Sequence, residues 1–182
     1  MAVDHVPSHF ELFDLPPTFA VDRGLLDTRY RELQRTTHPD RFVNAGDRER
    51  LQSVQQATRV NEGYRVLKDP LLRGRYMLEQ SGYAFDEAHH TTSDTAFLME
   101  QMELRDALTE VRGAQDSFAA LGAIMDRIAD DLAALEKQLA VQLAAGDMDA
   151  PAAADTLVKM QFFRKLQDEA VELEVMLEDE LA

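Results

Sequence analysis

Hydrophobic residues near the start of the chain recur at helical spacing. Leu26, Tyr30 and Leu33 are four and three residues apart, which places them on one side of a helix. Asp22 can cap the start of this helix, and Pro39 ends it because a proline disfavours the α conformation at the residue before it. The residues that share one side of a second helix, predicted over about residues 47–67, are Leu51, Val54, Ala57, Asn61, Tyr64 and Leu67.

Two shorter helices accompany this pair. Ser8 and Glu11 have the spacing of a capping box, in which the two side chains satisfy free backbone amides at a helix start. Asp69 and Pro70 separate the second long helix from a short one predicted over about residues 71–79. An antiparallel hairpin is the economical arrangement for the two long helices, because a tight polar loop joins them.

The rest of the chain shows three longer helical patterns, over about residues 94–111, 116–145 and from Asp149 to near the C-terminus. Gly146 is expected to end the second of them as the residue just past its C-cap, and Pro151 lies early in the third. Three amphipathic helices with short connections predict a three-helix bundle, so the fold class is all-α. The inward positions are Phe97, Leu104, Leu108 and Val111 on the first helix, Phe118, Leu121, Met125, Ile128, Leu132, Leu135 and Leu139 on the second, and Phe163, Leu166, Ala170, Leu173 and Leu177 on the third.

The helix over 94–111 has a second surface that is apolar at its start and acidic along its length. It consists of Leu98, Met99, Met102, Glu103, Asp106 and Glu110. Exposed methionines on a helix are adaptable contacts, and acidic neighbours would select a basic partner. The alternative is that Leu98, Met99 and Met102 pack against the N-terminal part of the chain.

Charge divides the chain between its two parts. Residues 1–82 hold 12 acidic and 12 basic residues, whereas residues 83–182 hold 22 acidic and 7 basic ones. Such a composition shift is typical of a domain boundary, so we expect domains at 1–82 and 94–182 and a linker at 83–93. The net charge of −15 disfavours binding to nucleic acid or to an anionic membrane surface.

The absence of cysteine excludes disulfides, thiolate metal sites and a cysteine nucleophile. The first residues do not read as a signal peptide, and no run of about 18 apolar residues predicts a membrane span. These features favour a cytoplasmic protein.

The loop between the two long N-terminal helices contains His38, Pro39 and Asp40. Asp40 can accept charge-assisted hydrogen bonds from an arginine of a partner, and His38 can both donate and accept. Pro39 restricts the loop and lowers the entropy lost on docking. An ordinary turn is the alternative interpretation. Basic residues on the preceding helix are expected to form one positive stripe that steers toward an acidic patch, and they are Arg29, Arg31 and Arg35.

These motifs together resemble a J-domain, the module that stimulates the ATPase of DnaK-type chaperones, over residues 9–78. The matching strings are Tyr30-Arg31-Glu32-Leu33, His38-Pro39-Asp40-Arg41 and the segment from Asn61 to Pro70. Thr37 and Gly63 depart from the family pattern, and a glycine inside a helix costs about 1 kcal/mol relative to alanine. The resemblance implies a chaperone-binding set of His38, Pro39, Asp40, Arg29, Tyr30, Arg31 and Arg35.

A J-like domain followed by a short acidic bundle is similar to the HscB family of co-chaperones of iron–sulfur cluster assembly. The strings that carry this likeness run from Asp94 to Arg105 and from Ala152 to Thr156. The resemblance implies an HscA/DnaK-type chaperone and an IscU-type scaffold protein as partners, with neither catalysis nor a cofactor on this chain. The implied scaffold contacts are Leu98, Met99, Met102, Glu103, Asp106, Glu110 and, on the third helix of the bundle, Phe162.

Two other functions stay open from the sequence. A general J-protein would deliver unfolded clients, although such proteins usually carry a glycine-rich linker or a cysteine-rich module, and this chain has 8 glycines and no cysteine. A metalloenzyme would need ligands such as His89 and His90 with Asp86, Glu87 and Asp94. Adjacent histidines point in different directions on regular structure, which disfavours that site.

Overall fold

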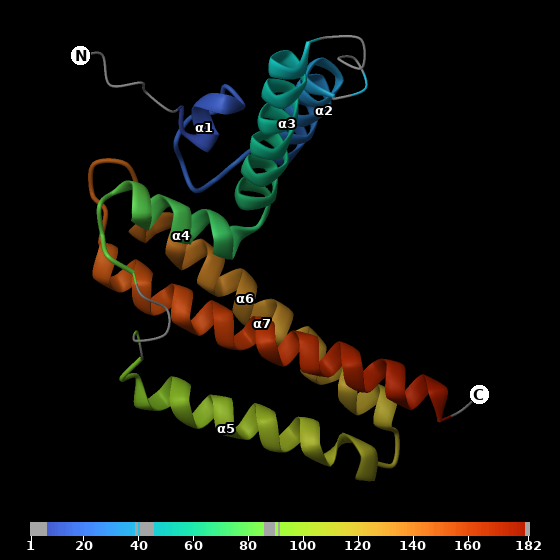
Figure 1. Cartoon of the computed structure of the whole chain (residues 1–182). Helices are drawn as coiled ribbons and strands as arrows, with labels where there is room; N and C mark the ends of the chain where they lie inside the picture. The colour runs from blue at the N-terminus through green and yellow to red at the C-terminus, as the bar shows by residue number, and fades with distance from the viewer. Residues whose placement is uncertain (1–6, 39, 41–45, 86–89, 91, 181–182) are drawn as a thin grey trace.

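The computed structural model describes residues 7–38, 40, 46–85, 90 and 92–180 (Figure 1). Within these ranges the chain forms α-helices, short 3-10 segments and no strand, which confirms the predicted all-α fold. The elements are α1 (His9–Leu12), α2 (Arg23–Thr37), α3 (Asp47–Lys68), α4 (Pro70–Gln80), α5 (Thr95–Glu110), η2 (Val111–Gly113), α6 (Ser117–Gln142) and α7 (Ala150–Asp179).

Side-chain caps fix where most helices begin. At α1 the backbone N–H of Glu11 donates to Ser8 Oγ over 3.2 Å, and the N–H of Ser8 donates to Glu11 Oε2 over 2.6 Å, which confirms the capping box. Aspartate carboxylates accept from backbone amides at the starts of five further helices, and these residues are Asp22, Asp69, Asp94, Asp116 and Asp149. Local side-chain chemistry therefore sets most of the boundaries that the sequence predicts.

Helices α2 and α3 form the expected hairpin, which projects from the rest of the molecule (Figure 1). Tyr30 of α2 stacks on Tyr64 of α3, with ring centroids 3.9 Å apart and planes inclined by 12°. The Tyr64 hydroxyl donates to Asp27 Oδ1 over 2.9 Å, and the Tyr30 hydroxyl donates to Asn61 Oδ1 over 3.0 Å. This aromatic pair and its hydrogen bonds hold the two helices together where little aliphatic core is available.

The buried side of α3 differs from the predicted one at its start. Leu51 and Val54 are exposed, whereas Ser53 and Val60 are buried. Ser53 tolerates burial because its hydroxyl donates to the Arg50 carbonyl over 2.9 Å. Spacings of three and four residues fit two neighbouring stripes of this helix equally well, and packing against other helices decides which stripe is buried.

Gly63 lies where α1 and the residue that follows it pack closely on α3. A Cβ at this position would lie 3.0 Å from Phe13 Cε2 and 3.1 Å from His9 Nδ1. The glycine that weakens the helix therefore makes room for the segment that covers it.

Helix α4 joins the two predicted domains through a shared core. Leu67 and Leu78 belong to the same buried cluster as Leu139 of α6 and Leu157 of α7. Gly74 allows the close approach, because a Cβ there would lie 2.8 Å from the Cδ2 atoms of both Leu139 and Leu157. The hydrophobic core thus runs across the point where the charge composition changes, and the division into domains stays a prediction.

Helices α5, α6 and α7 form the three-helix bundle, and most of the predicted inward positions are buried or half-buried in it. Phe118 is an exception, because it is exposed in the first turn of α6. Helix α6 also ends at Gln142 rather than near residue 145. Gly146 has the expected positive φ of 87°, but it lies in the following turn, where the Asp149 N–H donates to the Gln142 carbonyl over 2.9 Å.

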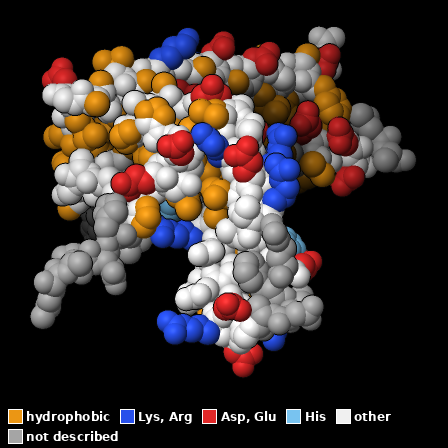
Figure 2. Space-filling model, turned by 90° about the horizontal axis from the view of Figure 1, so that it is seen from above, with side chains coloured by type: hydrophobic (Ala, Val, Ile, Leu, Met, Phe, Trp, Pro, Cys, Tyr) orange, Lys and Arg blue, Asp and Glu red, His pale blue; other side chains and the backbone are white. Residues whose placement is uncertain are grey.

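The kinds of side chain on the surface differ between the two parts of the molecule. In the view from above, hydrophobic side chains gather over the broad part of the molecule, and the narrower projecting part carries mainly charged and other polar side chains (Figure 2). No helix within the described ranges is both long enough and apolar enough to cross a membrane.

Candidate functional sites

The tip of the α2–α3 hairpin presents an imidazole and a carboxylate side by side. His38 is the C-cap of α2, and the backbone N–H of Asp40 donates to its Nδ1 over 3.3 Å. The Asp40 carboxylate oxygen Oδ2 lies 3.5 Å from the same nitrogen, with side chains 58% and 85% exposed. Both groups are thus accessible to a partner, while Pro39 lies outside the described residues.

Two of the three predicted arginines gather next to this tip. Arg31, Gln34, Arg35 and His38 line an open groove on one side of α2. The Arg35 Nε donates to the Arg31 carbonyl over 3.3 Å, which orients its side chain along the helix. The groove, the imidazole and the Asp40 carboxylate form one polar surface.

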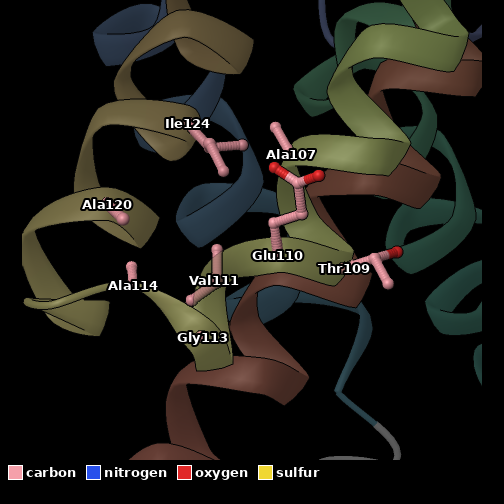
Figure 3. Close-up of a pocket in the computed structure, with 8 residues that line it drawn as sticks. All are labelled: Ala107, Thr109, Glu110, Val111, Gly113, Ala114, Ala120 and Ile124. Carbon is pink, nitrogen blue, oxygen red and sulfur yellow. The ribbon is translucent and has the colours of Figure 1, made fainter.

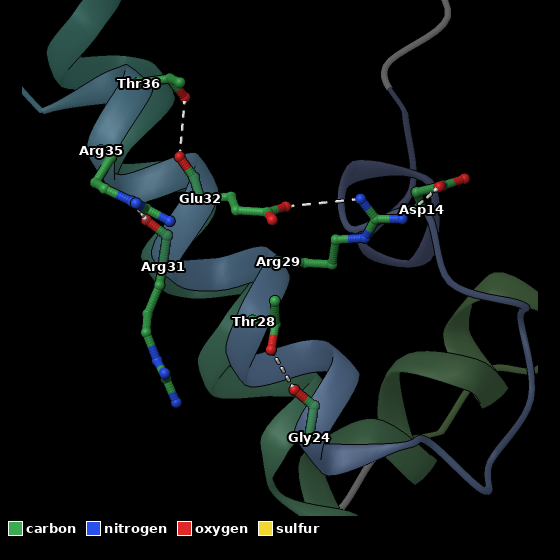
Figure 4. Close-up of polar contacts among 8 residues, drawn as sticks. All are labelled: Asp14, Gly24, Thr28, Arg29, Arg31, Glu32, Arg35 and Thr36. Carbon is green, nitrogen blue, oxygen red and sulfur yellow. Dashed lines mark hydrogen bonds and ion pairs between the residues drawn. The ribbon is translucent and has the colours of Figure 1, made fainter.

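Arg29 points the other way, so the predicted single stripe of three arginines is wrong (Figure 4). Its Nη2 lies 3.1 Å from Asp14 Oδ2, and its Nη1 lies 3.6 Å from Glu32 Oε2. Positions 29 and 31 are about 200° apart around a helix, so they face opposite sides. Tyr30 is half-buried in the stack with Tyr64, and its main contact is within the hairpin.

Helix α5 carries the second candidate site on its outer side, which we call the α5 face. Leu98, Met99 and Met102 are 42%, 60% and 68% exposed. The α5 face also includes three exposed acidic residues, Glu103, Asp106 and Glu110. The alternative in which the apolar trio packs against the N-terminal part is wrong, because α5 lies across α6 and α7 from the hairpin (Figure 1).

Phe162 of α7 lies beside α5 and is half-buried. Its ring is nearly perpendicular to that of Phe97, with centroids 5.7 Å apart, and the Arg105 guanidinium carbon lies 5.9 Å from its centroid. Helical periodicity did not single out this residue, because it sits one position before the buried Phe163. An apolar residue at the edge of an inward stripe is the sequence signal that could have found it.

An open groove lies at the far end of the α5 face, where α5 meets η2 and the start of α6. Figure 3 shows Glu110 and Val111 on one side and Ala120 and Ile124 of α6 on the other. Glu110 belongs both to this groove and to the acidic row of the α5 face. The face therefore ends at a small apolar hollow and not at a flat surface.

No group of three or more metal-ligating side chains occurs within the described ranges. His90 instead lies near the aromatic rings of Phe85 and Tyr83, with centroids 5.2 and 6.2 Å away. Three other residues of the possible metal site, Asp86, Glu87 and His89, lie outside the described residues, and the fifth, Asp94, is paired with Lys159.

Comparison with known proteins connects these surfaces to one family. A family model described as the HSCB C-terminal oligomerisation domain matches residues 93–171. A co-chaperone protein HscB homolog of Shewanella oneidensis is 47% identical over 175 residues, which cover 94% of this chain and 99% of that protein. A second HscB homolog, from Vibrio vulnificus, is 42% identical over 166 residues, covering 89% of this chain and 94% of its own.

Solved structures agree with this assignment. The chaperone HscB from Vibrio cholerae superposes with a TM-score of 0.83 at 40% identity, covering 94% of this chain and 99% of that one. Human co-chaperone HscB gives a TM-score of 0.85 at 29% identity, covering 96% of this chain and 86% of its own. The protein is thus a helical co-chaperone with a J-domain hairpin and a helical bundle. The chain belongs to the HscB family of co-chaperones, which confirms the family predicted from the sequence.

Proposed function

We propose that this chain is a co-chaperone of iron–sulfur cluster assembly that connects two partners. The hairpin tip would stimulate the ATPase of an HscA/DnaK-type chaperone, and the α5 face would present an IscU-type scaffold protein to it. The observation that carries the proposal is the presence of two exposed surfaces of different chemistry, one at the hairpin tip and one on α5, with α6 and α7 between them (Figure 1). Membership of the HscB family supports the same role.

The chemistry of the hairpin tip suits an electrostatic contact. The exposed Asp40 carboxylate can accept charge-assisted hydrogen bonds from an arginine of the chaperone. Arg31 and Arg35 lie on the same side and would steer the hairpin toward an acidic patch. Arg29 contributes from the other side by pairing with Asp14, which fixes α2 against the loop after α1.

The chemistry of the α5 face suits a protein partner with an apolar centre and basic surroundings. Exposed Leu98, Met99 and Met102 offer a contiguous apolar area on one helix, and such areas often mark protein interaction sites. The acidic row of the α5 face would select a basic rim on the scaffold protein. In this role the chain binds the scaffold protein and presents it to the chaperone, and it makes or breaks no covalent bond of the scaffold protein.

The first experiment is a calorimetric titration of the chain with an IscU-type scaffold protein. The triple variant Leu98→Ala, Met99→Ala and Met102→Ala should lose at least about tenfold in affinity, because the central apolar contacts of an interface carry most of its binding energy. Its helicity by circular dichroism should be unchanged, since all three side chains are exposed.

A matched control is Val171→Ala with Val175→Ala, two exposed apolar residues on α7 away from the α5 face. This variant should bind the scaffold as the unmodified chain does. If the unmodified chain binds no scaffold, the bundle has no iron–sulfur role and the general J-protein function gains weight.

The second experiment measures ATP hydrolysis by the chaperone. Asp40→Asn should abolish stimulation while scaffold binding stays intact, because the substitution removes the exposed charge that a partner arginine would contact. Asp130→Asn is the control, since it makes the same change of charge at an exposed position of α6, away from the hairpin. Normal stimulation by Asp40→Asn would show that the hairpin tip is not the chaperone site.

A further inference from the structure

A second groove runs between α5 and α6, next to the α5 face. Its walls include Met99, Glu100 and Glu103 from α5 and Arg127, Asp131 and Ala134 from α6. Met99 and Glu103 also belong to the α5 face, so the groove and the face are continuous. A partner that lies across Met99 therefore reaches the mouth of the groove.

The cations of this groove are already paired. Arg127 Nη2 lies 2.7 Å from Glu100 Oε1. Lys159 Nζ lies 2.8 Å from Asp94 Oδ2 and 3.0 Å from Asp155 Oδ2. These pairs tie α5 and α6 together at one point and hold the start of α5 against α7 at the other.

One carboxylate of the groove, that of Asp131, has no comparably close partner among the described residues. Asp131 Oδ2 is buried and accepts no hydrogen bond from any described residue, and Arg127 Nε lies 3.9 Å away from it, while the Asp131 side chain as a whole is 32% exposed. Burial raises the pKa of the Asp131 carboxyl, and the Glu100 carboxylate raises it further. A buried acceptor that makes no hydrogen bond to its cationic neighbour is incompletely satisfied, so a second cation that entered the groove would be stabilised there.

We propose that this groove receives a lysine or arginine side chain of the scaffold partner, with its charged end between Glu103 and Asp131. The aliphatic stem of such a side chain would lie along Met99 and the apolar floor formed by Phe97 and Leu135. The inference rests on the proposed function, because it names how the partner on the α5 face continues into the bundle. Charge complementarity and continuity with that face together specify the occupant.

The test compares two aspartate substitutions on α6 in the scaffold titration. Asp131→Asn should weaken binding at least about tenfold, because it removes the charge that a charge-assisted hydrogen bond to the partner's cation requires. Asp130→Asn makes the same change of charge one residue earlier, at an exposed position that does not line the groove. Its affinity should stay within about twofold of the unmodified chain, since an isolated surface charge contributes little.

A second pair of variants fills the groove from within. In Ala134→Arg the new guanidinium can reach Asp131 one turn away and occupy the place of the partner's side chain. Ala133→Arg adds the same charge at an exposed position outside the groove. Scaffold binding should fall strongly in the first variant and stay near normal in the second, with thermal unfolding by circular dichroism confirming that both are folded.

The outcomes separate this inference from the function on which it rests. Equal affinities of the Asp131→Asn and Asp130→Asn variants, with Ala134→Arg also binding normally, would overturn the groove contact. The alanine triple variant of the α5 face would still lose binding in that case, and the scaffold role would stand. Failure of the unmodified chain to bind any scaffold would overturn both.

Discussion

Helices α4 and α5 follow each other in the chain, yet one is enclosed and the other is open. Helix α4 has 11 residues and buries Leu71, Arg73, Gly74, Met77 and Leu78. Helix α5 has 16 residues and buries only Phe97, Leu104 and Leu108. Helix α4 joins the two parts of the molecule, whereas helix α5 presents an exposed surface.

The two helices are also attached by different means. Helix α4 is held by close packing and by the buried side chain of Arg73. The Arg73 Nη1 donates to the Leu67 carbonyl over 2.6 Å, and the Arg73 guanidinium carbon lies 4.6 Å from the Phe19 ring centroid. Helix α5 is held by one apolar stripe and by ion pairs at its edges, such as Arg105 with Glu169. A helix attached along one stripe keeps its other side available, which is what a docking surface requires.

The strongest test of this comparison removes one apolar side chain from each helix. Leu78→Ala in α4 should lower the free energy of unfolding by about 2–5 kcal/mol, because its side chain is fully buried and leaves a cavity. Met102→Ala in α5 should change it by less than about 0.5 kcal/mol, because that side chain is exposed. Urea denaturation measures both, and equal losses would contradict the division between the two helices.

A smaller effect on the free energy of unfolding is expected when a single methyl group is added where α4 meets α6 and α7. Gly74→Ala should destabilise the protein by about 1–3 kcal/mol, because the new Cβ would overlap the leucines of α6 and α7. Gly122→Ala in α6 is the matched control, since no atom beyond its chain neighbours and its own helix backbone lies within 4 Å of its Cβ position. That substitution should stabilise the helix by about 0.5–1 kcal/mol. A gain in both variants would mean that α4 is loosely packed.

The smallest effect concerns pH and the enclosed side of the molecule. His9 packs on α4, where its backbone N–H donates to the Tyr76 hydroxyl over 2.9 Å, and burial lowers the pKa of its imidazole. The unfolded chain, in which a histidine has its ordinary pKa of about 6.5, therefore takes up a proton first as the pH falls. Stability should decline as the pH drops through this value toward the lower folded pKa.

His9→Gln separates this contribution from the carboxylates that titrate at lower pH. Its free energy of unfolding should change less between pH 7.5 and pH 5.5 than that of the unmodified chain, in urea denaturations at each pH. Identical changes for the two proteins would show that protonation of His9 does not oppose folding.

The boundaries of the helices could be predicted from the sequence because they depend on local chemistry. Asp22, Asp94 and Asp116 were all recognisable as caps or starts, and each accepts a backbone hydrogen bond within three residues. The exposed α5 face was predictable for a related reason, since a bundle helix needs only one buried stripe and this helix has a second surface that is apolar at its start. The all-α fold followed from these elements.

Features that depend on packing between distant segments were not predictable in this way. Leu51 and Val54 have the spacing of a buried stripe, but nothing in the described structure covers them. Gly74 gave no signal of its own, because its role depends on side chains of α6 and α7 more than 60 residues away. Asp131 could not be picked out from the sequence either, since its groove exists only when α5 and α6 are side by side.

The shared core at α4 limits how this protein can be recombined with its relatives. A hairpin exchanged from another J-protein would arrive with an α4 whose inner surface was shaped for a different neighbour, or for water. A working chimera must therefore carry its own Leu139 and Leu157 equivalents, or keep Gly74 and the surrounding α4 residues from the bundle's parent. The segments to transfer together are therefore the hairpin and α6 and α7, the two helices on which α4 packs.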